Sequence, residues 1–349
     1  MLLKGCAIKL YFRVINSSMS LLKKISRLAI LFALLLTCGS WGFLVHKTTV
    51  QLAVYKLPKQ LQPFFYKQLK YLVANAGRPD TRRNTDSTEG PRHFIDLERF
   101  GPNEGYVMPY SWDSAQRIYS RDSLLMYGYV PYEVTRIQAK LTNAFRTGVA
   151  DSILFYATDL AHYIGDAHVP LHTTENYDGQ LSDQKGIHSL WESMIPELQL
   201  GTYQLYDDHK AVYLQNPSVA IWEAIRGANK LLPEMLAKEK EISKNFVPET
   251  KYRVQVRRGK EVRSYSTEFA KAYATALGNS INQQLLKSSN LVADFWYTAW
   301  VDAGKPELPE QFTKPEKKAF KRELKVFEKN QLLIDSLLLA KKEPPRVSE

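Results

Sequence analysis

Histidine and carboxylate residues at a four-residue spacing are the first features of this sequence that can carry chemistry. His162 and Asp166 lie four residues apart in an apolar stretch. In a helix this spacing places both side chains on one face, with Cβ atoms about 5–6 Å apart, so an imidazole and a carboxylate can converge on one cation. Pro170 ends or bends this helix, which lets His172 face the same cavity. The segment therefore predicts three ligand groups at one end of a helix.

A second pair, His188 and Glu192, repeats the four-residue spacing. One such pair alone is more often a hydrogen-bonded pair than a metal site. Two pairs with His172 between them would place five titratable groups on otherwise apolar helices, and each would need a buried partner. Imidazole nitrogen and carboxylate oxygen are the ligands expected for zinc in a hydrolase, so we favour a zinc centre. His168 is expected to pack or to support the ligands, and His209 to lie in a surface loop.

The elements that must position these groups are predicted to be mostly helical. Apolar residues recur at helical spacing over 48–76 (two helices), 131–147, 149–168, 186–198, 218–244 and 267–300. Residues 77–130 are rich in Gly, Pro, Asp and Asn, which predicts long loops with short helical turns. Residues 252–265 alternate and turn at Gly259, which indicates one β-hairpin. We therefore expect an all-α domain over 41–304 with one small hairpin.

Both ends of the chain differ from this central region. Residues 1–40 have a basic stretch, an apolar run and a small-residue end, the layout of a signal peptide, and we predict cleavage between Ser40 and Trp41. The protein would then be secreted or periplasmic. The alternative is a lipoprotein anchored through Cys38. Residues 305–349 contain a charged amphipathic helix, expected over about 315–341, that is either solvated or docked on the domain.

The net charge of +11 normally raises nucleic acid or an anionic membrane as a partner. The first forty residues, however, contain six basic and no acidic residues, and the stretch 41–304 is close to neutral. Composition is that of a globular protein and excludes a wholly disordered or collagen-like chain. Both cysteines precede residue 41, so no disulfide is expected in the mature protein.

With these residues in place, the chain resembles the zinc-dependent phospholipase C and single-strand-specific nuclease superfamily. These enzymes are all-α phosphodiesterases with three zinc ions in one cleft. The resemblance covers Trp41 to about residue 200 and fills nine ligand positions in order: Trp41, His46, Asp80, His93, His162, Asp166, His172, His188 and Glu192. It implies that the mature N-terminal amine and carbonyl of Trp41 bind zinc.

The resemblance also implies how three zinc ions share these ligands. The first takes Asp80, His93, His162 and Asp166; the second takes His172, His188 and Glu192; the third takes Trp41, His46 and a shared Asp166. An α-amino group has a pKa of about 8, so it can release its proton to zinc near neutral pH. Two cations bridged by Asp166 would lower the pKa of a shared water to give hydroxide, and would stabilise both oxygens of an in-line attack on phosphorus. Asp80 would orient this water or act as its base.

The substrate is where the two branches of the superfamily differ. Glu192 is phospholipase-like, because the nucleases carry Asp there. Arg83, three residues after Asp80, resembles a nuclease arginine that contacts the phosphate, and would stabilise transition-state charge. Phe94 and Asp96 would stack on and hydrogen-bond a base, although phospholipases share this pair.

We favour a secreted phospholipase C-like hydrolase acting on a phospholipid head group, with a single-strand-specific endonuclease or 3'-nucleotidase as the alternative. This preference rests on two features. The catalytic segment is near neutral and lacks the basic stripe of a strong nucleic-acid binder, and the run from Thr173 to His188 resembles the secreted bacterial phospholipase C-like branch. A third hypothesis is a surface protein that binds zinc without hydrolysis. The sequence implies no stable protein partner, and we expect a monomer.

Overall fold

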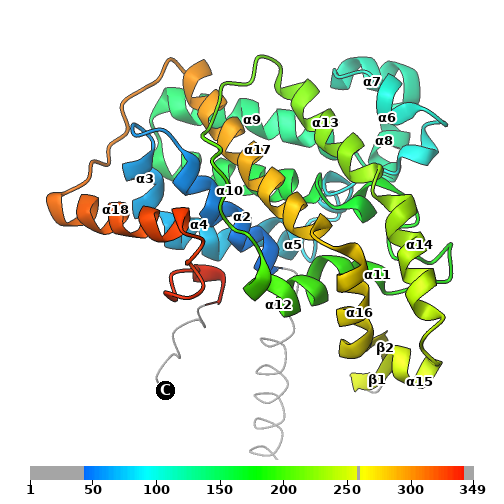
Figure 1. Cartoon of the computed structure of the whole chain (residues 1–349). Coiled ribbons are helices and arrows are strands. Elements are labelled where there is room, and N and C mark those ends of the chain that lie inside the picture. Colours follow the sequence, from blue (N-terminus) through cyan, green and yellow to red (C-terminus); the bar gives the residue numbers. More distant parts are fainter. Residues whose placement is uncertain (1–42, 258–259, 342–349) are drawn as a thin grey trace, which may run out of the picture. The chain divides into compact units, whose positions relative to one another are not determined.

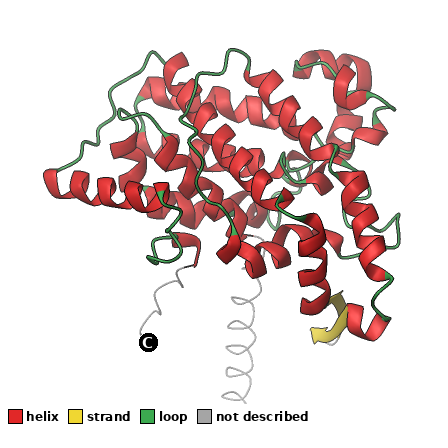
Figure 2. Cartoon of the chain, viewed as in Figure 1, coloured by secondary structure: helices red, strands yellow, loops and turns green. Residues whose placement is uncertain are grey.

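The computed structural model describes residues 43–257 and 260–341. Helices make up most of this region (Figures 1 and 2). Their bounds are α2 Phe43–Lys56, α3 Gln62–Lys67, α4 Leu69–Asn75, α5 Arg78–Arg82, α6 Glu104–Val107, α7 Trp112–Tyr119, α8 Arg121–Tyr127, α9 Val130–Thr147, α10 Ala150–Asp166, α11 Ile187–Ser189, α12 Ile195–Gln199, α13 Pro217–Asn229, α14 Leu232–Ser243, α15 Pro248–Lys251, α16 Thr267–Leu277, α17 Ser280–Asp302 and α18 Lys314–Glu328. The all-α prediction is confirmed. In the described part of the chain, no helix is long and apolar enough to cross a membrane.

The main core lies between α2, α9, α10 and α17: α17 contacts the other three, and α10 also contacts α2 and α9 (Figure 1). The long helix α17 buries an apolar face that includes Phe295 and Trp296, and the Trp296 indole N–H donates a hydrogen bond to the Ala157 carbonyl at 3.0 Å. This packing holds α10 against both α9 and α17. Because α10 carries His162 and Asp166, the core positions the predicted ligands.

Several helix boundaries differ from the prediction. The helix expected over 218–244 is two helices, α13 and α14, since Pro233 lies in the first turn of α14 and cannot continue a preceding helix. The helix expected over 267–300 breaks at Gly278, which has φ +61° and caps α16. Over 77–130 the chain forms the short helices α5–α8 between loops, as predicted.

The β-hairpin is confirmed. Strands β1 (Tyr252–Arg257) and β2 (Lys260–Tyr265) pair antiparallel, with Tyr252 opposite Tyr265 and Arg257 opposite Lys260. Within the described residues this is the one sheet (Figure 2). The predicted turn residue Gly259 lies outside them.

The C-terminal segment docks on α2. Phe320 and Phe327 of α18, together with Leu332 and Leu338, form a buried cluster with Tyr55 and other residues. The helix expected over 315–341 ends earlier, at Glu328, because Asn330 takes a positive φ of +57°. The Asn330 side chain accepts a hydrogen bond from Leu205 N at 2.6 Å, so the chain turns back and buries the two leucines.

Candidate metal centre

The C-terminal turn of α10 supplies the two central groups of the site. His162 and Asp166 are 0% and 1% exposed, and they lie on one face of the helix as predicted. The helix ends at Asp166 because Val169 is extended ahead of Pro170, a conformation that proline imposes on the residue before it. His162 donates its Nδ1 proton to the Ala76 carbonyl at 2.9 Å, which leaves Nε2 free to act as a ligand.

Four side chains converge in what we call group A: Asp80, His93, His162 and Asp166. His93 Nδ1 lies 2.9 Å from Asp166 Oδ2 and 3.2 Å from His162 Nε2, and His162 Nε2 lies 3.3 Å from Asp166 Oδ2. Asp80 Oδ1 lies 3.6 Å and 3.7 Å from the two imidazole nitrogens. Tetrahedral zinc with bonds of about 2.0–2.1 Å would hold its ligand atoms about 3.3 Å apart. The ligand atoms of His93, His162 and Asp166 therefore fit one zinc ion, and Asp80 lies near the two imidazoles and also forms a set of close ligand atoms with His46 and His162.

Group B consists of His172, His188 and Glu192. The two imidazole Nε2 atoms lie 3.1 Å apart, and Glu192 Oε2 lies 2.6 Å from His188 Nε2 and 3.5 Å from His172 Nε2. His172 is held in place because its Nδ1 donates to the His93 carbonyl at 2.7 Å. These spacings also suit one zinc ion.

Group C consists of His46, Asp166 and Glu192. His46 Nε2 lies 3.4 Å from Asp166 Oδ1 and 3.7 Å from Glu192 Oε1. Asp166 therefore faces group A with one carboxylate oxygen and group C with the other. The sequence placed Trp41 with His46 and Asp166; Trp41 lies outside the described residues, and the structure adds Glu192 to this set.

Burial and the carboxylates set the charge of the site. Burial alone would raise the pKa of Asp166, but the imidazoles of His162, His172 and His93 lower it well below its usual range. Burial alone would lower the pKa of His93, but Asp166 and other carboxylates raise it to about 9. The lowered pKa of Asp166 and the raised pKa of His93 both mean that the site favours positive charge, which a cation can supply. His168 lies apart from the groups, and burial lowers its pKa to about 4, so it packs as a neutral residue.

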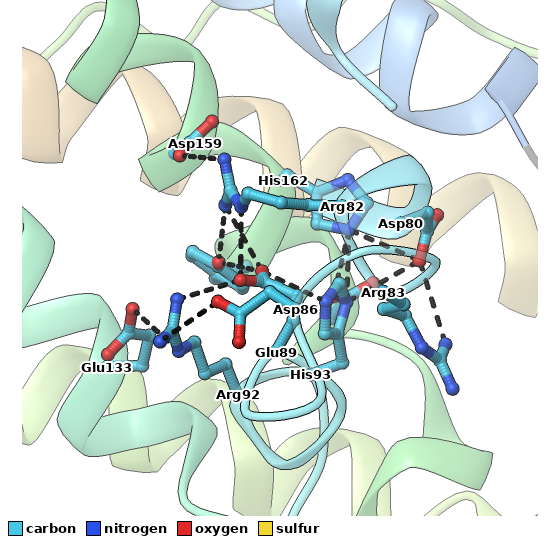
Figure 3. A network of polar contacts seen from close by, with 12 residues as sticks. Asp80, Arg82, Arg83, Asp86, Glu89, Arg92, His93, Glu133, Asp159 and His162 are labelled. Carbon is cyan, nitrogen blue, oxygen red and sulfur yellow. Dashed lines mark hydrogen bonds and ion pairs between the residues drawn. The ribbon is translucent and has the colours of Figure 1, made fainter. Parts of the chain in front are cut away.

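Asp80 and Arg83 lie at the exposed side of group A. The Asp80 side chain is 32% exposed and comes from the short helix α5. The Arg83 side chain, at the end of α5, is 53% exposed, and its Nη1 lies 3.8 Å from Asp80 Oδ1 (Figure 3). The structure thus places one accessible positive charge beside the one accessible carboxylate of group A.

Phe94 and Asp96 belong to a segment that backbone hydrogen bonds fix beside the ligands. Ile95 N donates to the His172 carbonyl, and Asp96 N donates to the Tyr127 carbonyl. Gly128, at φ +86°, allows the close approach of this segment, since a Cβ there would lie 2.3 Å from the Phe94 carbonyl oxygen. Burial, then the charges of Glu98 and Glu175, raises the pKa of Asp96 to about 7.

The family model described as S1/P1 nuclease matches residues 41–295, a region that contains all of these groups. The chain belongs to the S1/P1 nuclease family. Among the curated proteins compared, none matches the chain.

Members of the S1/P1 nuclease family are zinc-dependent phosphodiesterases, which confirms the resemblance seen in the sequence and makes this chain a zinc-dependent phosphodiesterase. His93, His162 and Asp166 of group A, together with groups B and C, fit that metal by donor type and spacing. The family supports the nuclease alternative better than the phospholipase C-like interpretation. The three-zinc count, the individual roles of the site residues and the domain boundaries stay predictions.

Sequence reasoning missed a network of buried charges behind group A in this S1/P1 nuclease family member (Figure 3). Glu89 is 0% exposed and accepts hydrogen bonds from Arg82, Arg92 and the Tyr163 hydroxyl. Burial would raise the pKa of Glu89, but the nearby His93 imidazole and the hydrogen bonds from Arg82 and Tyr163 lower it well below its usual range. The one sequence signal was that Glu89 lies four residues before His93. His209 lies in a loop and is partly exposed, as predicted, but it is also held in place, since its Nε2 lies 2.9 Å from Asp294 Oδ1.

Proposed function

We propose that this protein is a three-zinc nuclease that hydrolyses phosphodiester bonds of single-stranded nucleic acid. The observation that carries the proposal is the placement of Asp166, whose two carboxylate oxygens face two different groups at distances suited to zinc ligands. A shared carboxylate brings two cations close together, the arrangement that suits attack on a phosphodiester. The match to the S1/P1 nuclease family supports nucleic acid as the substrate.

The described residues would divide the work as follows. Groups A, B and C would hold the ions, and bound zinc would supply positive charge that lowers the pKa of water and stabilises phosphate oxygens. Asp80 has a partly exposed carboxylate that can orient a water and take its proton. Arg83 can reach a phosphate oxygen, because it is half exposed and its contact with Asp80 is a loose ion pair of 3.8 Å. Its charge would then stabilise the transition state.

Trp41 would complete group C after export. Cleavage between Ser40 and Trp41 would create the free amine, and the family match begins at this residue. Mass analysis of the N-terminus of the purified protein tests this step. A Trp41 N-terminus is the expected result, whereas a lipidated Cys38 would leave the Trp41 nitrogen in a peptide bond and would remove it as an amine ligand.

One observation favours phospholipid as a second candidate substrate. Glu192, where the nucleases carry Asp, lies in both group B and group C. The deciding experiment compares hydrolysis of single-stranded DNA or RNA with hydrolysis of a phosphatidylcholine emulsion by the zinc-loaded mature protein. We expect release of nucleotides and no release of diacylglycerol.

The other outcomes of this assay are equally informative. Diacylglycerol release without nucleotide release would overturn the nuclease proposal and support a phospholipase C. Activity on neither substrate, with zinc bound, would support a zinc-binding protein without hydrolysis. Measured zinc content of the same sample tests the expected three ions per chain.

A further inference from the structure

His93 presents a different ring nitrogen to the metal centre from the other described histidines of groups A, B and C. His46, His162, His172 and His188 all turn Nε2 toward the neighbouring ligands. His93 instead turns Nδ1 toward Asp166 and His162, at 2.9 Å and 3.2 Å. Its Nε2 atom therefore points to the opposite side, away from the metal position.

The outward nitrogens show how two of these imidazoles are oriented. His162 and His172 each donate Nδ1–H to a backbone carbonyl, of Ala76 and of His93. The outward Nε2 of His93 is buried and makes no hydrogen bond of normal geometry in the described part of the chain. It lies 3.4 Å from Glu89 Oε1, so a small ring rotation would complete a hydrogen bond to a carboxylate (Figure 3).

Glu89 is fixed much more firmly than an ordinary ion-pair partner. Arg82 donates two hydrogen bonds of 3.1 Å to it, Arg92 donates one of 2.7 Å, and the Tyr163 hydroxyl donates another. Arg82 is fixed in turn by Asp159, whose Oδ2 lies 2.9 Å from Arg82 Nη1. Keeping a carboxylate at 0% exposure is costly without such partners. The oxygen that faces His93 is held by both Arg82 and Tyr163.

We propose that Glu89 is a positioning residue for the metal centre: it accepts the Nε2 proton of His93 and so holds Nδ1 toward the group A metal. A carboxylate behind a metal-bound imidazole fixes its tautomer and makes the inner nitrogen a better donor. Arg82, Arg92 and Tyr163 keep this carboxylate ionised and immobile. The inference rests on the zinc centre of the proposed function.

The alternative is that Glu89 only joins two arginines as a structural centre of charge. Glu89→Gln distinguishes the positioning role from the structural role, because the substitution keeps the length of the side chain and removes its charge. Asp159→Asn is the matched control, since Asp159 is also buried, at 2% exposure, and binds Arg82, whereas the carboxylate paired with His93 Nε2 is that of Glu89. Both variants are expected to lower the melting temperature of the zinc-free protein.

Zinc affinity is the readout that a purely structural role would not change. In competition with a chromogenic chelator, we expect Glu89→Gln to weaken the zinc affinity of group A by about 10- to 100-fold. The zinc affinity of Asp159→Asn should match that of the wild type. Equal zinc affinity of Glu89→Gln and Asp159→Asn would overturn the inference. A wild type that binds no zinc would instead overturn the proposed function.

A second measurement needs no variant and remains decisive if Glu89→Gln fails to fold. In zinc-loaded wild-type protein labelled with ¹⁵N in histidine, imidazole NMR spectra identify the metal-bound nitrogen of each ring. We expect His93 to bind through Nδ1 and to carry its proton on Nε2. Binding through Nε2 would show that Glu89 does not orient this ring.

Discussion

At the scale of single residues, Asp166 is the residue on which most of the site depends. Its two carboxylate oxygens lie 2.9 Å from His93 Nδ1 and 3.4 Å from His46 Nε2, so each oxygen serves a different group. The site tolerates this buried charge because imidazoles surround it. An amide at this position would offer one oxygen and no charge.

We therefore predict that Asp166→Asn loses zinc from groups A and C and lowers kcat/KM by more than about 100-fold. This loss exceeds the roughly 10- to 100-fold that is typical when a residue that only supports a metal ligand is changed. Zinc content by atomic absorption and a steady-state assay on single-stranded DNA check both parts. Retained turnover at wild-type zinc content would refute the shared role of this carboxylate.

Asp96 leads to a prediction about pH. Burial, with the charges of Glu98 and Glu175, raises its pKa to about 7 in the folded protein, against an ordinary value near 4. The folded state therefore binds this proton more tightly than the unfolded state. Its contribution to the free energy of unfolding is present at low pH and is lost as pH rises from about 4 through about 7.

Asp96→Asn should remove this dependence. Urea unfolding of both proteins between pH 4.5 and 8 measures it: the stability of wild type relative to the variant should fall across this range. If Asp96 contacts the substrate, KM should also change near pH 7 in wild type and stay flat in the variant. Parallel stability profiles would mean that the Asp96 pKa is not raised.

The same residue scale shows what could be predicted from the sequence. The four-residue spacing correctly predicted that His162 lies beside Asp166 and His188 beside Glu192, because local helix geometry alone brings such residues together. Spacing could not show that Glu192 also faces His46, since this depends on how α2 packs. Glu89 was missed because it lies in a loop, where a four-residue spacing has no fixed geometry.

At the scale of elements, the helices were predictable from apolar periodicity and their ends were less so. Two breaks, at Gly278 and ahead of α14, follow from local residues that interrupt a helix. The early end of α18 depends instead on hydrogen bonds between Asn330 and residues 203–205, far away in sequence. Tertiary contacts of this kind leave no periodic signal.

The contact between α2 and α10 leads to a prediction about Gly165. A Cβ at this position would lie 2.8 Å from His46 Nδ1 and 3.0 Å from His46 Cε1. His46 has little room to move, since it is 3% exposed and stacks on His162 with ring centroids 4.1 Å apart. Gly165→Ala should displace His46 from group C and reduce kcat by roughly 100-fold, the scale of a 1 Å misplacement.

Gly227→Ala in α13 is the matched control, because a Cβ there meets no atom within 4 Å. It should raise the free energy of unfolding by about 0.5–1 kcal/mol through helix propensity and leave zinc content unchanged. Zinc content, kcat and urea unfolding of both variants are compared. If Gly165→Ala behaves like Gly227→Ala, close packing at Gly165 does not position His46.

At the scale of the whole molecule, α2 joins the metal centre to the C-terminal segment. His46 lies near its beginning, and Tyr55, near its end, packs on Phe327 and donates a hydrogen bond to Glu323 of α18. Glu323 also accepts a 2.7 Å hydrogen bond from the Tyr66 hydroxyl. The segment after residue 304 thus supports the helix that carries His46, although the family match ends at residue 295.

We predict that Phe327→Ala lowers the free energy of unfolding by about 3–5 kcal/mol, because Phe327 is 0% exposed and its ring lies 4.9 Å and 5.2 Å from the rings of Tyr55 and Tyr206. Ile334→Ala, 77% exposed in the same segment, should stay within about 0.5 kcal/mol of wild type. Urea unfolding measures both. Zinc content and kcat at 25 °C should be unchanged in each, since neither side chain contacts groups A, B or C. Equal stability of the two variants would show that the segment does not support α2.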